Sequence, residues 1–192
     1  MSRSNESAKI KPKVPITLAS GSESRKLMLE EAGIIFDVIV SQVDEELIKK
    51  KIFTLPFSQQ VICLAKAKAE SVSQQNPESI VIGGDQMCVL DGNLLHKPGT
   101  KEKAIKSLKL LANKKHYQYS GVSIFKDGEC VWEYSETVEL KMHNLSESEI
   151  KNYVELENPI NAAGSYKFES LGCNLFSYVN GSSHTVRGMP LI

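Results

Sequence analysis

Residues 20–26, which read Ser-Gly-Ser-Glu-Ser-Arg-Lys, have the composition of an anion-binding loop. They follow a short apolar run and precede a helical pattern, and the free backbone N–H groups at the start of a helix attract anions. Arg25 and Lys26 would lie in the first helical turn, where a cation is unfavourable unless an acidic neighbour or a bound anion balances it. A phosphate would balance both. The alternative is that Ser22 only caps the helix and Glu23 neutralises the cations.

Asp85 is the second candidate, because it follows Gly83 and Gly84 in a buried-strand pattern. Ligands of open α/β sheets commonly bind where strands end, and paired glycines let a ligand approach the backbone closely. At the expected end of this strand, Asp85 could bind a metal ion or orient a water molecule. An aspartate in such a place is equally an ordinary turn residue, so its neighbours must decide between the two interpretations.

Other carboxylates and lysines could complete a hydrolytic site. Asp44, Glu45 and Glu46 could hold a hard cation through oxygen, and the ammonium groups of Lys68 and Lys97 could cover phosphate charge. Acidic triplets are usually solvated, however, and lysines of an alanine-rich helix are usually surface residues. None of these residues therefore indicates a site by itself.

Composition and missing motifs exclude several classes of protein. Lys+Arg and Asp+Glu are balanced at 23 each, so there is no broad basic field to bind nucleic acid or an acidic membrane. The cysteines and the histidines lack metal-ligand spacing, and neither a P-loop nor a G-x-G-x-x-G motif occurs. No apolar run is long enough for a membrane span, and no secretory signal is recognised. A cytoplasmic location with reduced thiols is therefore expected.

The segments that must position these residues predict a mixed α/β sheet. Apolar and alternating runs predict strands at 14–19, 34–40, 79–84, 117–125 and 129–142. Helices are expected after Ser22, over 57–73, around Ile105 to Leu111, and after a capping box formed by Ser146 and Glu149. Asp91-Gly92 and Asp127-Gly128 indicate hairpin turns, and the remainder is glycine-rich and irregular.

The chain is expected to form one catalytic domain over residues 14–192, because it contains no internal repeat and no long linker. The polar residues 1–13 have little apolar surface to offset the entropy of ordering, so they are expected to be flexible.

Taken in order, the motif-bearing segments resemble those of the Maf family of nucleoside triphosphate pyrophosphatases. The resemblance covers nearly the whole chain from Val14. It is carried by Leu-Ala-Ser-Gly-Ser-Glu-Ser-Arg at 18–25, Val-Asp-Glu at 43–45, Gly-Asp-Gln at 84–86, Lys-Pro at 97–98, Ser-Gly-Val at 120–122, Tyr-Val at 153–154, Asn-Pro at 158–159, Ala-Gly-Ser-Tyr-Lys-Phe-Glu at 163–169 and Gly-Met-Pro-Leu at 188–191.

This resemblance implies an elongated mixed α/β sheet of the Maf and ITPase kind, with flanking helices and a cleft between two lobes. It also implies release of pyrophosphate from a nucleoside triphosphate to leave a monophosphate, with Mg²⁺ or Mn²⁺ as cofactor and frequently as a homodimer. Asp85 would accept a proton and, with Glu45, hold the metal ion. The residues implied around the triphosphate are Ser20, Ser22, Arg25, Lys68 and Lys97.

Gln86 and Glu169 resemble the branch of the family that acts on 7-methyl-GTP, whereas the dTTP/UTP branch typically carries Thr and Gln there. A carboxylate can accept hydrogen bonds from N1–H and N2–H₂ of guanine but would repel the carbonyl oxygens of uracil or thymine. The positive charge of an N7-methylated base also favours an acidic pocket. Ser24, which stands where this branch often has a bulky residue, would widen the base pocket.

Three alternatives stay open. A dTTP/UTP pyrophosphatase would keep the enzyme class and change the base. A nucleotide-binding regulatory protein with little hydrolysis is motivated by Glu23, Ser24 and Lys26, which depart from the residues usual in the family. A nucleic-acid-binding module is disfavoured by the zero net charge.

Overall fold

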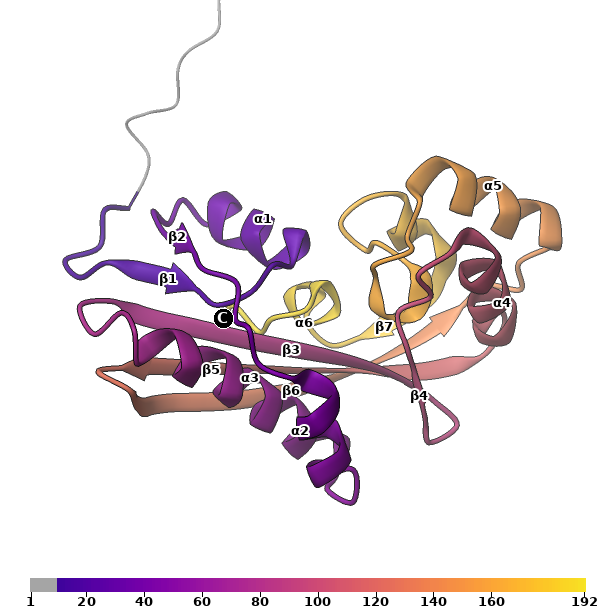
Figure 1. Ribbon diagram of the computed structural model, residues 1–192. Coiled ribbons are helices and arrows are strands. Elements are labelled where there is room, and N and C mark those ends of the chain that lie inside the picture. The colour runs from indigo at the N-terminus through magenta and orange to yellow at the C-terminus, as the bar shows by residue number, and fades with distance from the viewer. Residues whose placement is uncertain (1–9) are drawn as a thin grey trace, which may run out of the picture.

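The computed structural model describes residues 10–192, which form a seven-stranded sheet flanked by helices (Figure 1). The strands lie in the order β2-β1-β3-β5-β6-β7, and β4 pairs with β3. β1 is parallel to β2 and β3, and the other pairs are antiparallel, which confirms the expected mixed α/β class. The strands are β1 (Ile16–Leu18), β2 (Asp37–Val38), β3 (Ile80–Leu90), β4 (Asn93–Leu95), β5 (Lys115–Lys126), β6 (Glu129–Met142) and β7 (Phe176–Asn180).

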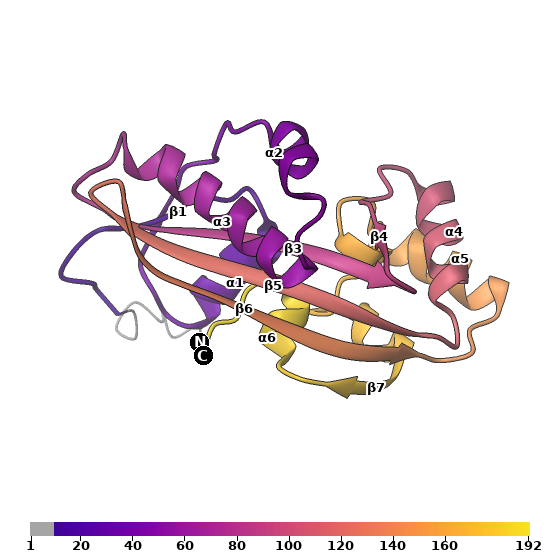
Figure 2. The same cartoon turned by 90° about the horizontal axis from the view of Figure 1, so that it is seen from below.

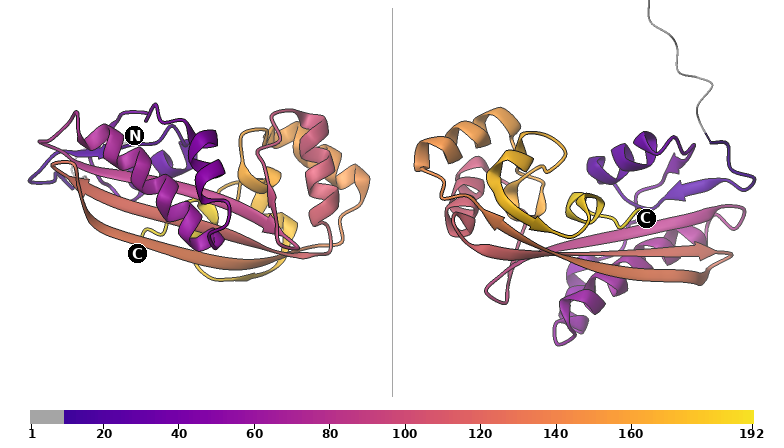
Figure 3. Two further views of the ribbon diagram at one scale, coloured as in Figure 1. Left: turned by 60° about the horizontal axis from the view of Figure 1, so that its bottom comes forward. Right: turned by 180° about the vertical axis from the view of Figure 1, so that it is seen from behind.

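Helices cover both faces of the sheet. They are α1 (Glu23–Glu31), α2 (Glu45–Ile52), α3 (Phe57–Ser73), α4 (Lys101–Leu111), α5 (Glu147–Glu157) and α6 (Ser183–Arg187), with short 3₁₀ turns η2 (Ala163–Ser165) and η3 (Leu171–Leu175). α3 packs along β3, β5 and β6 on one face, while α1, α6 and the α4–α5 pair lie on the other (Figures 1 and 3). Among the described residues, no helix combines the length and apolarity needed to cross a membrane.

Two lobes stand on the face that carries α1, and each has its own apolar core. The cluster around α4 and α5 includes Leu108, Leu140 and Val154. The cluster beneath α1 includes Met28 and Met189. The long strands β5 and β6 run the length of the molecule, as Figure 2 shows, so the two lobes share one continuous sheet.

Two glycines of the sheet let the backbone of α3 pack directly against the backbone of β3 and β5. A Cβ atom built on Gly83 would be only 2.2 Å from the Ala65 carbonyl oxygen, and one on Gly121 would be 2.6 Å from the Val61 carbonyl carbon. Any larger side chain at either position would push α3 away from β3 and β5. The close contact holds Lys68, which lies one turn beyond Ala65, over the middle of β3.

Two predicted strands differ from the structure. The strand predicted over 79–84 continues to Leu90, because Gly83 and Gly84 keep their pairing with β5 and only make room for neighbouring groups. The expectation that Asp85 ends a strand is therefore wrong, since it lies within β3. The strand predicted over 34–40 is reduced to β2, because β1 is short and pairs only with Asp37 and Val38.

Other predicted elements are confirmed, and three elements were not predicted. The helix over 57–73 is α3, the capping box starts α5, and the hairpins at Asp91 and Asp127 join their strands. α2, β7 and α6 lie in segments for which the sequence predicted no regular structure. Of the polar start, residues 1–9 lie outside the described residues, while Ile10 bridges to Ile34. All four cysteines are free, and Cys130 and Cys173 are exposed.

We expect Gly83→Ala to lower the free energy of unfolding by about 2–3 kcal/mol, because the added methyl group would overlap the α3 backbone. Urea denaturation followed by circular dichroism would measure the loss. Gly21→Ala is the matched control, because its Cβ would lie 3.4 Å from Val40 Cγ2. This ordinary contact should cost about 1 kcal/mol or less. Wild-type stability of Gly83→Ala would contradict the close approach of α3.

Candidate active site

Most of the side chains predicted to act line one cavity of about 900 Å³. Asp44 and Lys26 do not line it, and Asp44 instead caps α2 by accepting a hydrogen bond from Leu47 N over 2.9 Å. One wall comes from the β1–α1 loop, α2, α3 and β3, and the other from the β4–α4 linker and residues 158–169. The cavity therefore lies between the two lobes. The predicted residues that it brings together are Ser20, Ser22, Ser24, Arg25, Glu45, Lys68, Asp85, Gln86, Lys97 and Glu169.

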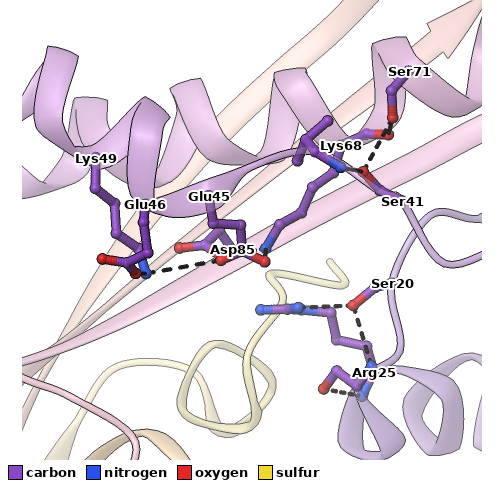
Figure 4. A network of polar contacts seen from close by, with 11 residues as sticks. Ser20, Arg25, Ser41, Glu45, Glu46, Lys49, Lys68, Ser71 and Asp85 are labelled. Carbon is purple, nitrogen blue, oxygen red and sulfur yellow. Dashed lines mark hydrogen bonds and ion pairs between the residues drawn. The ribbon is translucent and has the colours of Figure 1, made fainter.

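Lys68 connects two carboxylates that line the cavity with it (Figure 4). Its Nζ lies 2.7 Å from Asp85 Oδ1 and 3.0 Å from Glu45 Oε1. Lys68 and Asp85 are both buried, so each charge needs the other. Burial of Glu45 raises its pKa, but the positive charges of Lys68 and Lys49 outweigh burial, and the pKa is lowered.

Arg25 is buried beneath the loop that was predicted to bind an anion. Its Nε donates to the Gly188 carbonyl over 2.8 Å and its Nη1 to Ser20 Oγ over 3.0 Å. Nη2 makes no hydrogen bond within residues 10–192. Burial lowers the pKa of Arg25, while the charges of Asp85 and Glu45 raise it. Part of this guanidinium thus fastens the C-terminal segment, and part is left for an anion.

Ser22 caps α1, as the simpler interpretation of the loop proposed. Its Oγ accepts a hydrogen bond from Arg25 N over 3.5 Å, and Ser20 Oγ accepts one from Ser22 N over 3.3 Å. A capping hydroxyl can still donate its own hydrogen to a bound anion. The cap and the predicted phosphate contact are therefore compatible.

Lys97 adds positive charge from the opposite wall of the cavity. It makes no ion pair to any residue that the structure describes. Removal of water by the cavity walls lowers the pKa of Lys97, and the charges of Arg25 and Lys68 lower it further, although Glu45 and Asp85 act in the opposite direction. A polyanion would relieve this repulsion among the cations.

The three residues predicted to read the base also meet at this cavity, yet two of them are already engaged. Gln86 Nε2 donates to the carbonyls of Thr185 and Val186 over 3.0 and 2.8 Å, and Ser24 Oγ donates to the Arg187 carbonyl over 2.8 Å. Both side chains therefore hold α6 in place. Glu169 is exposed in the cavity wall.

Glu46, which was predicted as a possible cation ligand, lines the cavity as well, and so does Lys49, which the sequence did not assign to the site. Both belong to α2, where Lys49 pairs with Glu46 over 2.9 Å and with Glu45 over 3.9 Å. The order of charges along this segment could have predicted the helix that carries them. Asp44 is followed by two glutamates and then by lysines 49–51, which is the charge order that favours a helix. His96 lines the cavity beside Lys97.

The donor set can be tested against a divalent metal ion. No group of at least three His, Cys, Asp or Glu side chains comes together within the described part of the chain. Glu45 and Asp85 nevertheless place two carboxylates on one ammonium group. Mg²⁺ is commonly bound by one or two carboxylates, with water and substrate phosphates as its remaining ligands. The residues present therefore fit a metal ion that arrives with a phosphate chain.

Comparison with known proteins finds a matching family model, sequence relatives and a solved structure of low similarity. The family model described as "Maf-like protein" matches residues 15–192, which include every predicted site residue. A nucleoside triphosphate pyrophosphatase of Legionella pneumophila strain Philadelphia 1 is 39% identical over 178 residues, 93% of this chain and 89% of that protein. One from Ruegeria sp. strain TM1040 is 39% identical over 181 residues, 92% and 91% of the two chains. A solved HAM1 protein from Coxiella burnetii is 14% identical with TM-score 0.46, over 69% of this chain and 74% of that chain.

The lowered pKa of Glu45 makes its contribution to stability depend on pH. A carboxylate whose pKa is lowered by folding stabilises the protein above its ordinary pKa of 4.5, and this stabilisation is lost as the pH falls through the folded value. We expect Glu45→Gln to be less stable than wild type at pH 7, and this difference to vanish in more acidic solution. The difference at pH 7 should stay within about 1 kcal/mol, because the Glu45 side chain is 42% exposed.

Chemical denaturation at a series of pH values would measure this difference. Glu78→Gln is the matched control, because Glu78 is exposed and makes no ion pair to a described residue. A constant difference between Glu45→Gln and wild type down to pH 3 would show that the ion pair with Lys68 is not its source.

Proposed function

Since the chain belongs to the family of Maf-like proteins, we infer that it is a nucleoside triphosphate pyrophosphatase, a hydrolase acting on phosphorus-containing anhydrides. One observation of the structure carries this inference best. Arg25, Lys68 and Lys97 converge around the carboxylate of Asp85 in a cavity large enough for a nucleotide. Such cations can balance a triphosphate, and the carboxylate can activate water beside it.

The roles follow from the contacts of each group. Lys68 binds Asp85 Oδ1, so it fixes the orientation of the carboxylate. Oδ2 accepts no hydrogen bond from a described residue and can take the proton of the attacking water. Arg25 and Lys97 would stabilise the negative charge that builds up on the phosphate oxygens as the anhydride bond breaks.

A divalent ion, Mg²⁺ or Mn²⁺, would be held by Glu45 and Asp85 together with the phosphates. When bound, it would supply Lewis-acid stabilisation of charge on the phosphate oxygens. The chain's own part is to bring the two carboxylates together at the ammonium group of Lys68.

The preferred base is proposed to be 7-methylguanine, with a dTTP or UTP preference as the alternative within the same enzyme class. Glu169 supports the proposal, because an exposed carboxylate in the cavity wall can accept two hydrogen bonds from guanine. Gln86 would contribute through its Oε1, because its Nε2 is engaged by α6. A cytoplasmic location and a homodimer stay predictions.

We expect Asp85→Asn to lower kcat by at least about 100-fold, because an amide cannot accept the proton from water. Nucleotide affinity should change by less than about tenfold, since the cations that hold the phosphates remain. Pyrophosphate release and calorimetric titration measure the two quantities. Asp127→Asn makes the same chemical change in an exposed hairpin turn and should match wild type. Full turnover by Asp85→Asn would remove Asp85 from the reaction. If the wild-type protein itself bound nucleotide but showed no turnover, this result would favour the regulatory alternative.

The base preference can be tested on 7-methyl-GTP, GTP, UTP, dTTP, CTP and ATP. We expect wild type to prefer 7-methyl-GTP and Glu169→Gln to lose about tenfold to 100-fold in kcat/KM for it, as expected for loss of charged hydrogen bonds. Turnover of UTP should not fall in this variant. Glu129→Gln, an exposed glutamate that does not line the cavity, is the control. A wild-type preference for UTP or dTTP would overturn the guanine assignment but leave the enzyme class.

A further inference from the structure

The cavity wall formed by residues 162–170, which carries Glu169, has an unusual backbone. Gly164 has φ 77° and the next residue, Ser165, has φ 64°, in the left-handed region that residues other than glycine rarely adopt. Within the wall, the backbone forms isolated turns rather than a long helix or strand. Their hydrogen bonds include Ser165 N to Ala162 O at 3.0 Å and Ser170 N to Lys167 O at 3.3 Å. Its position must therefore depend on side-chain contacts to the rest of the protein.

Tyr166 makes the deepest of these contacts. It is 3% exposed although its ring borders the cavity, and its hydroxyl lies 2.7 Å from Gln118 Nε2 and 3.0 Å from His116 Nε2. Both partners are fully buried side chains of β5. The Tyr166 ring also packs edge-on against Phe176, with centroids 4.8 Å apart. The hydroxyl is thus enclosed between the wall and the sheet.

The Tyr166 hydroxyl is a shared partner for both β5 side chains. Burial lowers the pKa of His116 to about 4, so its ring is neutral at pH 7 and carries one N–H. The Gln118 amide donates to the phenol oxygen, and His116 Nε2 can either donate to the hydroxyl or accept from it. Gln118 Nε2 also donates to the Ala163 carbonyl over a longer 3.4 Å, and Gln118 Oε1 has no hydrogen-bond partner among the described residues. Loss of the hydroxyl would therefore leave two buried polar side chains poorly satisfied.

Strand β5 is also the strand that fixes Asp85. In the ladder between β3 and β5, Gly121 is opposite Asp85 and Gln118 is opposite Cys88. Tyr166 therefore ties the wall to the same pair of strands that carries the proposed proton acceptor. One nucleotide can bind across the cavity only if the wall and the strands that carry Asp85 keep a fixed separation.

A second set of contacts holds the wall from another side. Lys167 N donates to Tyr153 Oη over 2.9 Å, and Lys167 Nζ donates to the Glu157 carbonyl over 2.7 Å. These contacts lead to α5, which does not carry a residue of the proposed reaction. Tyr166, together with the 3.4 Å hydrogen bond from Gln118 Nε2 to the Ala163 carbonyl, thus relates the wall to the strands that hold Asp85.

We propose that Tyr166 is a positioning residue that, through His116 and Gln118, sets the distance between the base-contacting wall and Asp85. This proposal rests on the proposed function, because it gives the wall its role in holding the base of the nucleotide.

Tyr166→Phe is the first test, since it keeps the ring and removes only the hydroxyl. The expected result is a rise of about tenfold in KM for the preferred nucleotide, with kcat within about threefold of wild type, because the base is misplaced while Asp85 and the phosphate site are intact. The preference between bases should weaken at the same time. Val72→Ala is the matched control, because Val72 belongs to the core cluster beneath α3 and does not line the cavity. It should lose stability without a change in KM.

Gln118→Met is the second variant, because it keeps an unbranched side chain of similar length and removes the donor. If both residues act through one hydrogen bond, the double variant should raise KM no further than the single variants. An unchanged KM in both single variants, or an equal rise in KM in Val72→Ala, would overturn the positioning role.

Calorimetric Kd values for the same nucleotide distinguish a failure of this proposal from a failure of the proposed function. If the wild-type protein binds the nucleotide without turnover, the proposed function fails. In that case a tenfold rise in Kd for Tyr166→Phe would still support the positioning role of Tyr166, and an unchanged Kd would overturn it.

Discussion

Close contact between the backbone of α3 and the β3–β5 strand pair is the constraint on which the site is built. Gly83 and Gly121 are the residues that allow this contact, because a Cβ atom at either position would overlap α3. The contact lowers Lys68 onto Asp85, so that an ammonium group from a helix and a carboxylate from a strand meet at 2.7 Å inside the protein. If the helix were farther away by the depth of one methyl group, the two charges would separate and water would enter between them.

The buried charges of the cavity have partners, but its cations keep capacity for a ligand. Arg25 donates hydrogen bonds from two of its nitrogens, to Ser20 Oγ and to the carbonyl of Gly188. Lys68 is shared by Glu45 and Asp85, and Lys97 has no ion pair to a described residue. Because these groups are already held in place, a polyanion can meet fixed positive charge without waiting for side chains to reorganise.

The sequence predicts the parts of this structure that depend on neighbouring residues and misses those that depend on distant ones. The helix over 57–73 has clear periodicity, and Ser146 with Glu149 makes a local cap. The placement of Asp85 within β3 depends on α3 occupying the space above Gly83, which no local pattern reveals. Family resemblance, rather than periodicity, predicts which residues meet in the cavity. The engagement of Gln86 by the α6 carbonyls could not be predicted, because α6 itself has no strong local signal.

The long strands that both lobes share have a mechanical consequence. Lobes joined by a flexible linker can rotate about a hinge, but β3, β5 and β6 continue through both lobes, so any rotation must bend or twist a hydrogen-bonded sheet. The width of the cavity is therefore stiff with respect to movements of whole lobes. Segments at the rim of the cavity can move more easily than whole lobes. This holds above all for α2, which has no buried residue and contacts the site through the carboxylate of Glu45.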